Sequence, residues 1–367
     1  MCGVQDPPKK MPDRLSSARR IHHAQQWLFG GPLFIRGVCD IVGDYGQELE
    51  GKCIHTLFGH CGAVFYLAVL PSGQLVSGSD DARMHVWDVD SGTCLFTLAG
   101  HTGWVTALAV LPDGKLASGS CDKTVRVWEN GECLFTLAGH TESVNALAVL
   151  PDGKLASGSG DNTVRVWDTK SGECLLTLAG HTSWVTALAV LPDGKLVSGS
   201  GDKTVRVWGN GECLLTLQGH TDKVISLVVM PDGKLASGSC DNTVRVWGNG
   251  ECLFTLQGHT DKVTSLVVMP DGKLASGSFD RTARVWDPTS GVCLFTLKGH
   301  TSSVSCLAVL HDGRLASGSY DGKVRVWANG ECALTLDASF SCVFALAVLP
   351  NGNLAACSNF HTVRVWR

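Results

Sequence analysis

Residues 155–167 read Leu-Ala-Ser-Gly-Ser-Gly-Asp-Asn-Thr-Val-Arg-Val-Trp, and eight versions of this stretch occur along the chain. Their closing tryptophans stand 39 or 41 residues apart, at positions 87, 128, 167, 208, 247, 286, 327 and 366. In the first seven versions a Gly-His pair precedes the tryptophan at a fixed distance, and an aspartate lies six residues before it. A period of this length indicates an array of similar small units that bury a core only against their neighbours.

Each repeat contains four short segments typical of strands. Residues 144–150 are a nearly continuous apolar run, of the kind that is buried on both faces of a sheet. A Pro-Asp-Gly turn at residues 151–153 leads into residues 154–159. Residues 124–128 and 133–137 are the β-rich runs of the neighbouring repeat. Four strands per unit at this period predict an all-β protein built as a β-propeller.

The Gly-His pair, the aspartate and the Val-Arg-Val-Trp ending resemble the WD-repeat family over residues 53 to 367. The resemblance implies that the histidine, a serine of the second strand, the aspartate and the tryptophan form a hydrogen-bonded chain within one repeat. In this sequence the chain maps onto seven sets: His60, Ser77, Asp81, Trp87; His101, Ser118, Asp122, Trp128; His140, Ser157, Asp161, Trp167; His181, Ser198, Asp202, Trp208; His220, Ser237, Asp241, Trp247; His259, Ser276, Asp280, Trp286; and His300, Ser317, Asp321, Trp327.

A serine, a histidine and an aspartate also make up the catalytic triad of many hydrolases. A catalytic set needs one unique site, whereas these sets recur seven times. We therefore interpret them as buried polar networks that hold each unit's turn. The eighth repeat lacks the set, because the equivalent positions hold Ser339, Ala356 and Phe360 before Trp366. We expect this unit to be the least stable one.

The two ends of the repeat array complement each other. Residues 53–57 read as an outer strand with no inner strands before it, and the last repeat ends at Trp366 and Arg367 without an outer strand. We expect these two ends to pair, because pairing removes an open sheet edge. The prediction is an eight-bladed WD-repeat β-propeller closed by an N-terminal strand. Seven blades with one stray repeat are the alternative.

Composition limits the classes of function. The chain has 367 residues, 44% hydrophobic residues and a formal net charge of −4, which does not favour binding of nucleic acid through bulk charge. We expect residues 1–50 to be a partly disordered extension and residues 51–367 to be the propeller. The apolar segment 27–42 is too interrupted to span a membrane, so we expect it to dock on the propeller flank or to bind a second partner. Residues 1–20 lack the apolar stretch of a signal peptide, so we expect a cytoplasmic or nuclear protein.

Eight of the sixteen cysteines recur at the start of the same outer strand. Periodic placement favours a small, buried apolar residue that stays reduced. The sequence has no Cys-x-x-Cys pair and no phosphate-binding glycine loop before a helix. We therefore predict neither a metal site nor a cofactor.

The positions at which the repeats differ are the candidates for function, because the architecture makes the others alike. Two loops per repeat open on one face of a propeller, namely the loop after the Gly-His pair and the turn before the aspartate. Loops on a rigid scaffold commonly carry binding sites. Most repeats hold small or polar residues there, and a few hold aromatic or charged ones. We predict a partner-binding surface formed by these exceptions: Trp104, Trp184, Lys223, Lys262, Phe279, Tyr320 and Asp80.

These candidates also have a purely structural interpretation. The alternative for the two tryptophans is that they pack over the rim of the channel. The alternative for Lys223 and Lys262 is local neutralisation, because Asp222 and Asp261 precede them. As a binding surface, aromatic rings with two lysines suit an extended peptide that carries an acidic or phosphorylated residue.

We expect a non-catalytic scaffold for protein–protein interactions that binds a peptide or domain, as part of a multiprotein complex, and is itself monomeric. The repeats also resemble the propellers of F-box substrate receptors of ubiquitin ligases, so a ubiquitin-ligase adaptor is one alternative. Against it, residues 1–50 show no convincing F-box and no arginine stands before the aspartate to read phosphate. Two further classes stay open, namely a propeller enzyme with a site in the channel and a structural component of an assembly. We expect no nucleic acid and no membrane among the partners.

Overall fold

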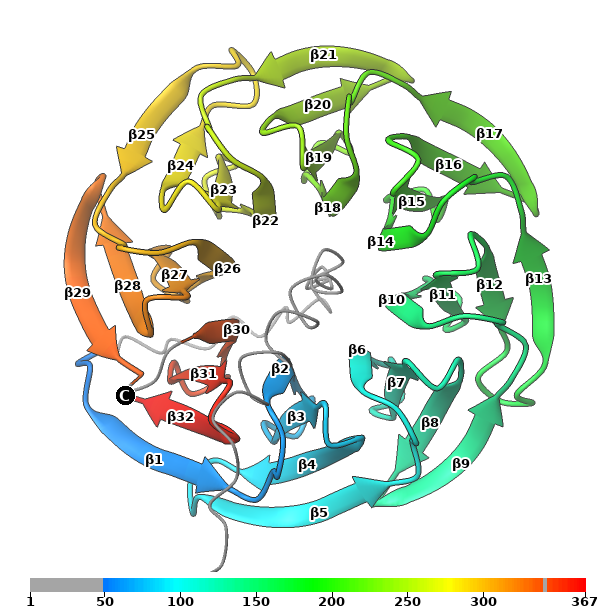
Figure 1. Cartoon of the computed structure of the whole chain (residues 1–367), viewed down its shortest axis with the longest axis horizontal. Coiled ribbons are helices and arrows are strands. Elements are labelled where there is room, and N and C mark those ends of the chain that lie inside the picture. Colours follow the sequence, from blue (N-terminus) through cyan, green and yellow to red (C-terminus); the bar gives the residue numbers. More distant parts are fainter. Residues whose placement is uncertain (1–48, 339–341) are drawn as a thin grey trace, which may run out of the picture.

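The computed structural model describes residues 49–338 and 342–367. These residues form eight four-stranded antiparallel sheets, which follow one another around a central axis in chain order (Figure 1). The predicted eight-bladed propeller is therefore confirmed. The N-terminal extension predicted for residues 1–50, including its apolar segment, lies almost wholly outside the described residues.

We number the blades in chain order and give their strands from the axis outward. Blades 1 to 4 contain the following strands: β2 Val64–Val69, β3 Leu75–Ser79, β4 Arg83–Asp88, β5 Thr93–Ala99; β6 Val105–Val110, β7 Leu116–Ser120, β8 Val125–Glu129, β9 Glu132–Leu137; β10 Val144–Val149, β11 Leu155–Ser159, β12 Val164–Trp167, β13 Cys174–Leu178; β14 Val185–Val190, β15 Leu196–Ser200, β16 Val205–Gly209, β17 Glu212–Leu217. Blades 5 to 8 contain the following strands: β18 Val224–Val229, β19 Leu235–Ser239, β20 Val244–Gly248, β21 Glu251–Leu256; β22 Val263–Val268, β23 Leu274–Ser278, β24 Ala283–Trp286, β25 Cys293–Leu297; β26 Val304–Val309, β27 Leu315–Ser319, β28 Lys323–Ala328, β29 Glu331–Asp337; β30 Val343–Val348, β31 Leu354–Ser358, β32 Thr362–Trp366, β1 Cys53–Phe58.

Blade 8 is closed by strands from both ends of the repeat array. Strand β1 pairs antiparallel with β32, in a register that runs from Cys53 opposite Trp366 to Phe58 opposite Thr362. One further backbone pair extends the ladder, because Lys52 and Arg367 exchange hydrogen bonds of 3.1 and 2.9 Å. The predicted closure is confirmed, and the alternative of seven blades with a stray repeat is wrong.

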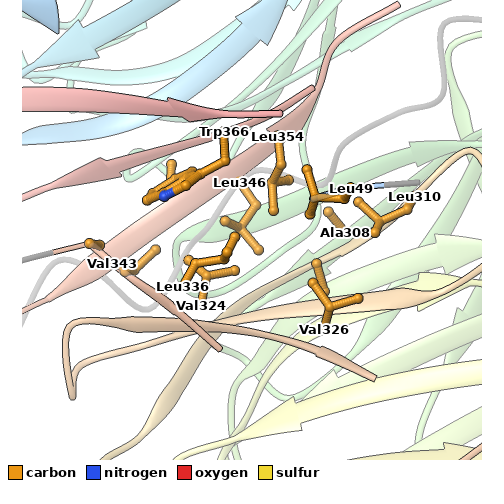
Figure 2. Packing of buried hydrophobic residues seen from close by; sticks show 13 residues of the cluster. Leu49, Ala308, Leu310, Val324, Val326, Leu336, Val343, Leu346, Leu354 and Trp366 are labelled. Carbon is orange, nitrogen blue, oxygen red and sulfur yellow. The ribbon is translucent and has the colours of Figure 1, made fainter. Parts of the chain in front are cut away.

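The core lies between blades. In blade 3, Leu155 and Trp167 pack against Val125 and Val127 of blade 2, and all four residues are at most 1% exposed. Figure 2 shows the equivalent cluster between blades 7 and 8, which includes Trp366. A single blade exposes these faces, so stacking supplies the buried apolar area that holds the ring together.

The prediction that the periodic cysteines are buried is wrong. Seven of the eight are exposed and Cys293 is partly exposed, and all described cysteines are free thiols. The outer strand is the free edge of each sheet, and the residue of that strand that points into the core is its last leucine, such as Leu137. Cys133 lies opposite Trp128 at this edge, and its Sγ accepts a hydrogen bond from Arg126 Nη1 at 3.7 Å.

The described residues contain no helix that could span a bilayer.

Candidate functional site

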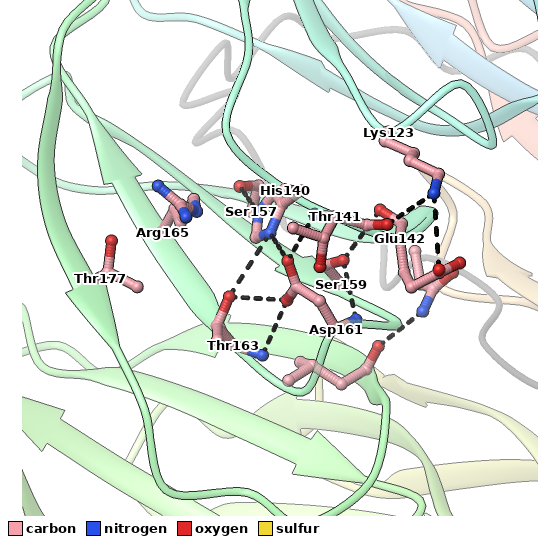
Figure 3. A network of polar contacts seen from close by, with 12 residues as sticks. Lys123, His140, Thr141, Glu142, Ser157, Ser159, Asp161, Thr163, Arg165 and Thr177 are labelled. Carbon is pink, nitrogen blue, oxygen red and sulfur yellow. Dashed lines mark hydrogen bonds and ion pairs between the residues drawn. The ribbon is translucent and has the colours of Figure 1, made fainter.

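The polar chain implied by the resemblance is present in blade 3, and Figure 3 shows its histidine, serine and aspartate. Trp167 Nε1 donates to Ser157 Oγ at 2.8 Å, and the same oxygen lies 2.7 Å from His140 Nε2. An indole nitrogen only donates, so the serine hydroxyl is left to donate its own proton to His140 Nε2. The other ring nitrogen, Nδ1, then donates to Asp161 Oδ2 at 2.8 Å.

Asp161 is held as a carboxylate by a full set of donors. Burial opposes its ionisation, but the Thr163 hydroxyl, the Thr141 backbone N–H and His140 together lower its pKa to about 2. The side chain of His140 is 1% exposed, so no substrate reaches it. The set in blade 3 therefore holds the turn between β11 and β12 in place.

The same chain recurs in every blade from 1 to 7. In each, the histidine Nδ1 lies 2.7 to 3.0 Å from the aspartate, and the tryptophan Nε1 lies 2.8 Å from the serine. In blade 8 the serine position is the buried Ala356 and the aspartate position is Phe360, which is 49% exposed. Neither side chain offers an oxygen atom, and Ser339 lies outside the described residues.

In blades 1 to 7 the two variable loops lie together, as predicted. The residue before the aspartate donates its backbone N–H to the carbonyl of the residue that follows the Gly-His loop. Examples are Cys121 to Trp104 at 2.9 Å, and Phe279 to Lys262 at 3.0 Å. We call the surface formed by these paired loops the top face.

Three of the predicted site residues belong to one row of aromatic rings, which also includes the buried Phe65 and the partly buried Phe344 of the innermost strands. Trp104 of blade 2 stacks on Phe65 of blade 1 at 6.2 Å between ring centroids, with 21° between the planes. Phe65 lies 4.6 Å from Phe344 of blade 8, Phe344 lies 5.8 Å from Tyr320 of blade 7, and Tyr320 lies 5.8 Å from Phe279 of blade 6. We call these five residues the aromatic arc. Aromatic pairs at such distances attract each other beyond their apolar burial.

Phe65 and Phe344 were missed by the comparison of loops, because they lie on the innermost strands. In five of the other six blades this position is polar and bonds to the next blade, whereas blade 5 has the buried Ile225. Asn145 Nδ2 donates to Val185 O at 3.0 Å, and Thr264 donates its hydroxyl to Val304 O at 2.7 Å. Alignment of the inner strands would have shown the two phenylalanines as departures from this pattern.

Trp184 lies in blade 4, outside the aromatic arc. The ammonium of Lys223 is 4.7 Å from its ring centroid, and the ammonium of Lys262 is 6.0 Å from the ring of Phe279. A cation over an aromatic face is attracted to it without losing its charge. Each lysine therefore lies against a ring of the top face.

The aspartates before these lysines bond to the backbone of the loop. Asp222 accepts a hydrogen bond from the backbone N–H of Lys223, and Asp261 accepts one from that of Lys262, both at 2.8 Å. Asp80, the remaining predicted residue, is half-buried in blade 1. It packs on the neighbouring loop, where a Cβ added to Gly62 would lie 1.8 Å from Asp80 Oδ1.

In the two described ranges, no group of three or more histidine, cysteine, aspartate or glutamate side chains is placed to hold a metal ion.

Comparison with known proteins agrees with this architecture. A family model described as WD domain, G-beta repeat, matches residues 51–88, 92–129, 131–168, 172–209, 211–248, 250–287 and 291–328. The unmatched residues after 328 include the blade that has lost the Gly-His pair and the aspartate. No curated protein matches the chain.

Two solved structures illustrate the likeness. The crystal structure of the computationally designed Ika8 protein is 35% identical with a TM-score of 0.78, over 86% of this chain and 99% of that one. The WD40 β-propeller domain of Doa1 is 29% identical with a TM-score of 0.61, over 74% of this chain and 94% of that one. With seven matched repeats and an eighth blade built to the same plan, the chain belongs to the WD-repeat family.

Proposed function

We propose that this protein is a non-catalytic interaction module that binds a peptide or a domain of another protein on its top face. The observation that carries the proposal is the aromatic arc, which runs over blades 2, 1, 8, 7 and 6. WD-repeat propellers typically bind other proteins or peptides. The polar chains are alike in seven blades, so they do not distinguish one partner from another.

The arc has the physical properties of an anchor surface. Trp104, Phe279 and Tyr320 are half-buried residues, and each ring is restrained by a neighbouring ring of the arc. Rings held in this way lose little conformational entropy when a partner packs on them. Large aromatics at the centre of an interface commonly carry most of its binding energy.

The test uses peptides selected on the protein from a random twelve-residue library. Affinity is measured for Trp104→Ser, Phe279→Ala and Tyr320→Ala; the serine copies Ser143 of blade 3. Each change at a true anchor weakens binding by about 2 kcal/mol or more. The control is Leu253→Ser on an outer strand, where the leucine is 42% exposed.

All four variants must keep the melting temperature of the unmodified protein to within a few degrees. Affinity that is unchanged in all three top-face variants would place binding elsewhere and end the proposal. An equal loss in Leu253→Ser would show that the peptides recognise exposed apolar surface in general.

A further inference from the structure

We infer that the partner segment is acidic, and that its carboxylates bind four cations of blades 4 to 6: Lys203, Lys223, Lys262 and Arg281. We call these residues the basic sector. The inference rests on the proposed function, because it describes the chemistry of the partner that the top face binds. It draws on residues that lie beside the aromatic arc and not within it.

Two of the cations are positioned before a partner arrives. Lys223 lies over the ring of Trp184, and Lys262 lies over the ring of Phe279. Their neighbours Asp222 and Asp261 each accept a backbone N–H bond. An ammonium held on a ring keeps its positive charge and has already lost part of its rotamer freedom, so it binds a carboxylate at a reduced entropic cost.

The other two cations occupy strained backbone positions. The turn after each top-face aspartate places one residue at positive φ, where only glycine and, to a lesser degree, asparagine fit without cost. Blades 3 and 5 have Asn162 and Asn242 there, at φ of 69° and 70°. Blades 4 and 6 instead have Lys203 and Arg281, at 72° and 70°, and both side chains are exposed. Blade 1 has Ala82 at the same position, at φ of 64°, so it is the exposed cation and not the strain that distinguishes blades 4 and 6 from it.

Blade 2 shows the difference between a paired and an available cation. Lys123 has the same backbone conformation, at φ of 74°, but its ammonium lies 3.4 Å from Glu142 and donates to Thr141 O at 2.6 Å. Neither Lys203 nor Arg281 has such a side-chain partner within residues 49–338 and 342–367. We therefore leave Lys123 out of the basic sector.

The aspartates of the polar chains lie below this surface and are already satisfied. Asp202 accepts bonds from His181, from the Thr182 backbone and from both the backbone and the hydroxyl of Thr204. Its side chain is 7% exposed. Lys203 and Arg281, by contrast, are exposed to solvent, and Lys223 and Lys262 are partly exposed on the rings that they contact. A net charge of −4 over the whole chain argues against a general polyanion such as RNA, so the attraction is local to the sector.

The test compares charge in the partner with charge in the protein. Peptides are selected from the random twelve-residue library on the unmodified protein and on the double variant Lys203→Asn/Arg281→Asn, which copies blades 3 and 5. We expect aspartate and glutamate to be enriched only on the unmodified protein. The best peptide is then synthesised with glutamate or with glutamine, and the glutamate form is expected to bind about tenfold tighter at low ionic strength, with the difference shrinking in about 0.5 M salt.

The double variant separates recognition from folding. Asparagine relieves backbone strain, so the melting temperature is expected to stay the same or to rise while affinity for the glutamate peptide falls about fivefold. The glutamine peptide keeps its affinity. If Lys203 and Arg281 had only a structural role, their replacement would not weaken binding while the melting temperature stays the same or rises.

Two failures are distinguishable. If glutamate and glutamine peptides bind equally, and both are lost in Tyr320→Ala, the acidic partner is overturned and the proposed function stands. If no top-face variant changes the binding of any selected peptide, both are overturned. Enrichment of lysine and arginine in the selected peptides would also overturn the acidic partner.

Discussion

The rings of Phe65 and Phe344 lie 4.6 Å apart, and they join blade 1 to blade 8 at a position where five of the other six blades use a polar side chain. In blade 3, for example, Asn145 reaches the carbonyl of Val185 in the next blade. The aromatic pair replaces this kind of bond beside the one blade that has lost its polar chain. Phe65 and Phe344 are also the central residues of the aromatic arc, between Trp104 and Tyr320.

Closure of blade 8 by β1 makes a truncation prediction. Deletion of residues 1–58 removes the strand that pairs with β32 and exposes its edge. We expect this protein to aggregate or to melt at a far lower temperature. The control is deletion of residues 1–48, which keeps Leu49 and the whole of β1. A monomeric product of the longer deletion, with an unchanged melting temperature, would contradict the closing role of β1.

A buried tryptophan of a central blade is predicted to be essential for stability. Trp208 is 2% exposed and donates to Ser198 Oγ at 2.8 Å. Trp208→Ala is expected to lower the free energy of unfolding by about 3 to 5 kcal/mol, through a cavity and a lost polar chain. Trp104→Ala, on the half-buried top face, is expected to cost about 1 kcal/mol or less. Denaturant unfolding of both variants measures the difference, and equal costs would show that the buried chain has no special weight.

Blade 8 is predicted to gain stability from a single hydroxyl. Ala356 occupies the position at which Ser157 accepts a bond from Trp167. Ala356→Ser supplies Trp366 with the same acceptor, and we expect it to raise the free energy of unfolding by about 1 kcal/mol. Ser157→Ala should lower it by a similar amount. Hydrogen exchange of β31 and β32 reports the local effect, and faster exchange after Ala356→Ser would count against this account.

His85 of blade 1 is predicted to make the protein sensitive to acid. It replaces the arginine of other blades, such as Arg126, and lies with its ring 4.2 Å from that of His60. Burial and the nearby His60 lower the pKa of His85 to about 4 from an ordinary 6.5. Because the unfolded chain binds the proton first, stability falls as the pH drops from 6.5 towards 4.

The variant His85→Arg restores the residue of the other blades and removes this titration. Because the variant has no group at this position that titrates in this range, we expect its advantage over the unmodified protein to grow between pH 6.5 and 4, by about 2 to 3 kcal/mol at most. Melting curves across this range measure it. A constant difference between the two proteins at every pH would show that another group causes the acid sensitivity.

The cysteines are predicted to fall into two classes of reactivity. Cys133 and Cys213 are exposed at outer strand edges, whereas Cys240 is buried and burial raises its pKa to about 11. Brief treatment of the folded protein with iodoacetamide should therefore label the outer-strand thiols and spare Cys240 and Cys357. Mass spectrometry of the labelled peptides gives the order, and the unfolded protein serves as the control in which all thiols react. Early labelling of Cys357 would contradict its burial.

Much of the fold follows from the repeat. The spacing of the tryptophans predicts the blades, and the incomplete ends of the array predict the pairing of β1 with β32. The resemblance supplied the partners of His140, which local patterns do not identify because Ser157 and Asp161 are 17 and 21 residues away. These features could be predicted because the repeats have the same residues at the positions that form the blade.

The cysteine and aromatic positions show where this reasoning stops. A regular spacing places Cys133 on a strand, but it does not say that the strand is a free edge, and that edge is why the residue is exposed. Phe65 reads as one more apolar residue in a buried run. Only the geometry between blades reveals that it joins Trp104 to Phe344. Contacts between units depend on how the units are stacked, which one repeat does not contain.

The pairing of β1 with β32 also predicts the order in which the molecule folds. Every other strand pairs with one that follows closely in the chain, whereas Cys53 and Trp366 are partners from opposite ends of the ring. Bringing them together from a flexible chain costs about 3 to 4 kcal/mol more in loop-closure entropy than forming a short hairpin. Local hairpins therefore form first, and each packed blade shortens the remaining gap. We expect ring closure to be the last step, and until it occurs an incomplete blade offers its free edge to a strand from any neighbouring molecule.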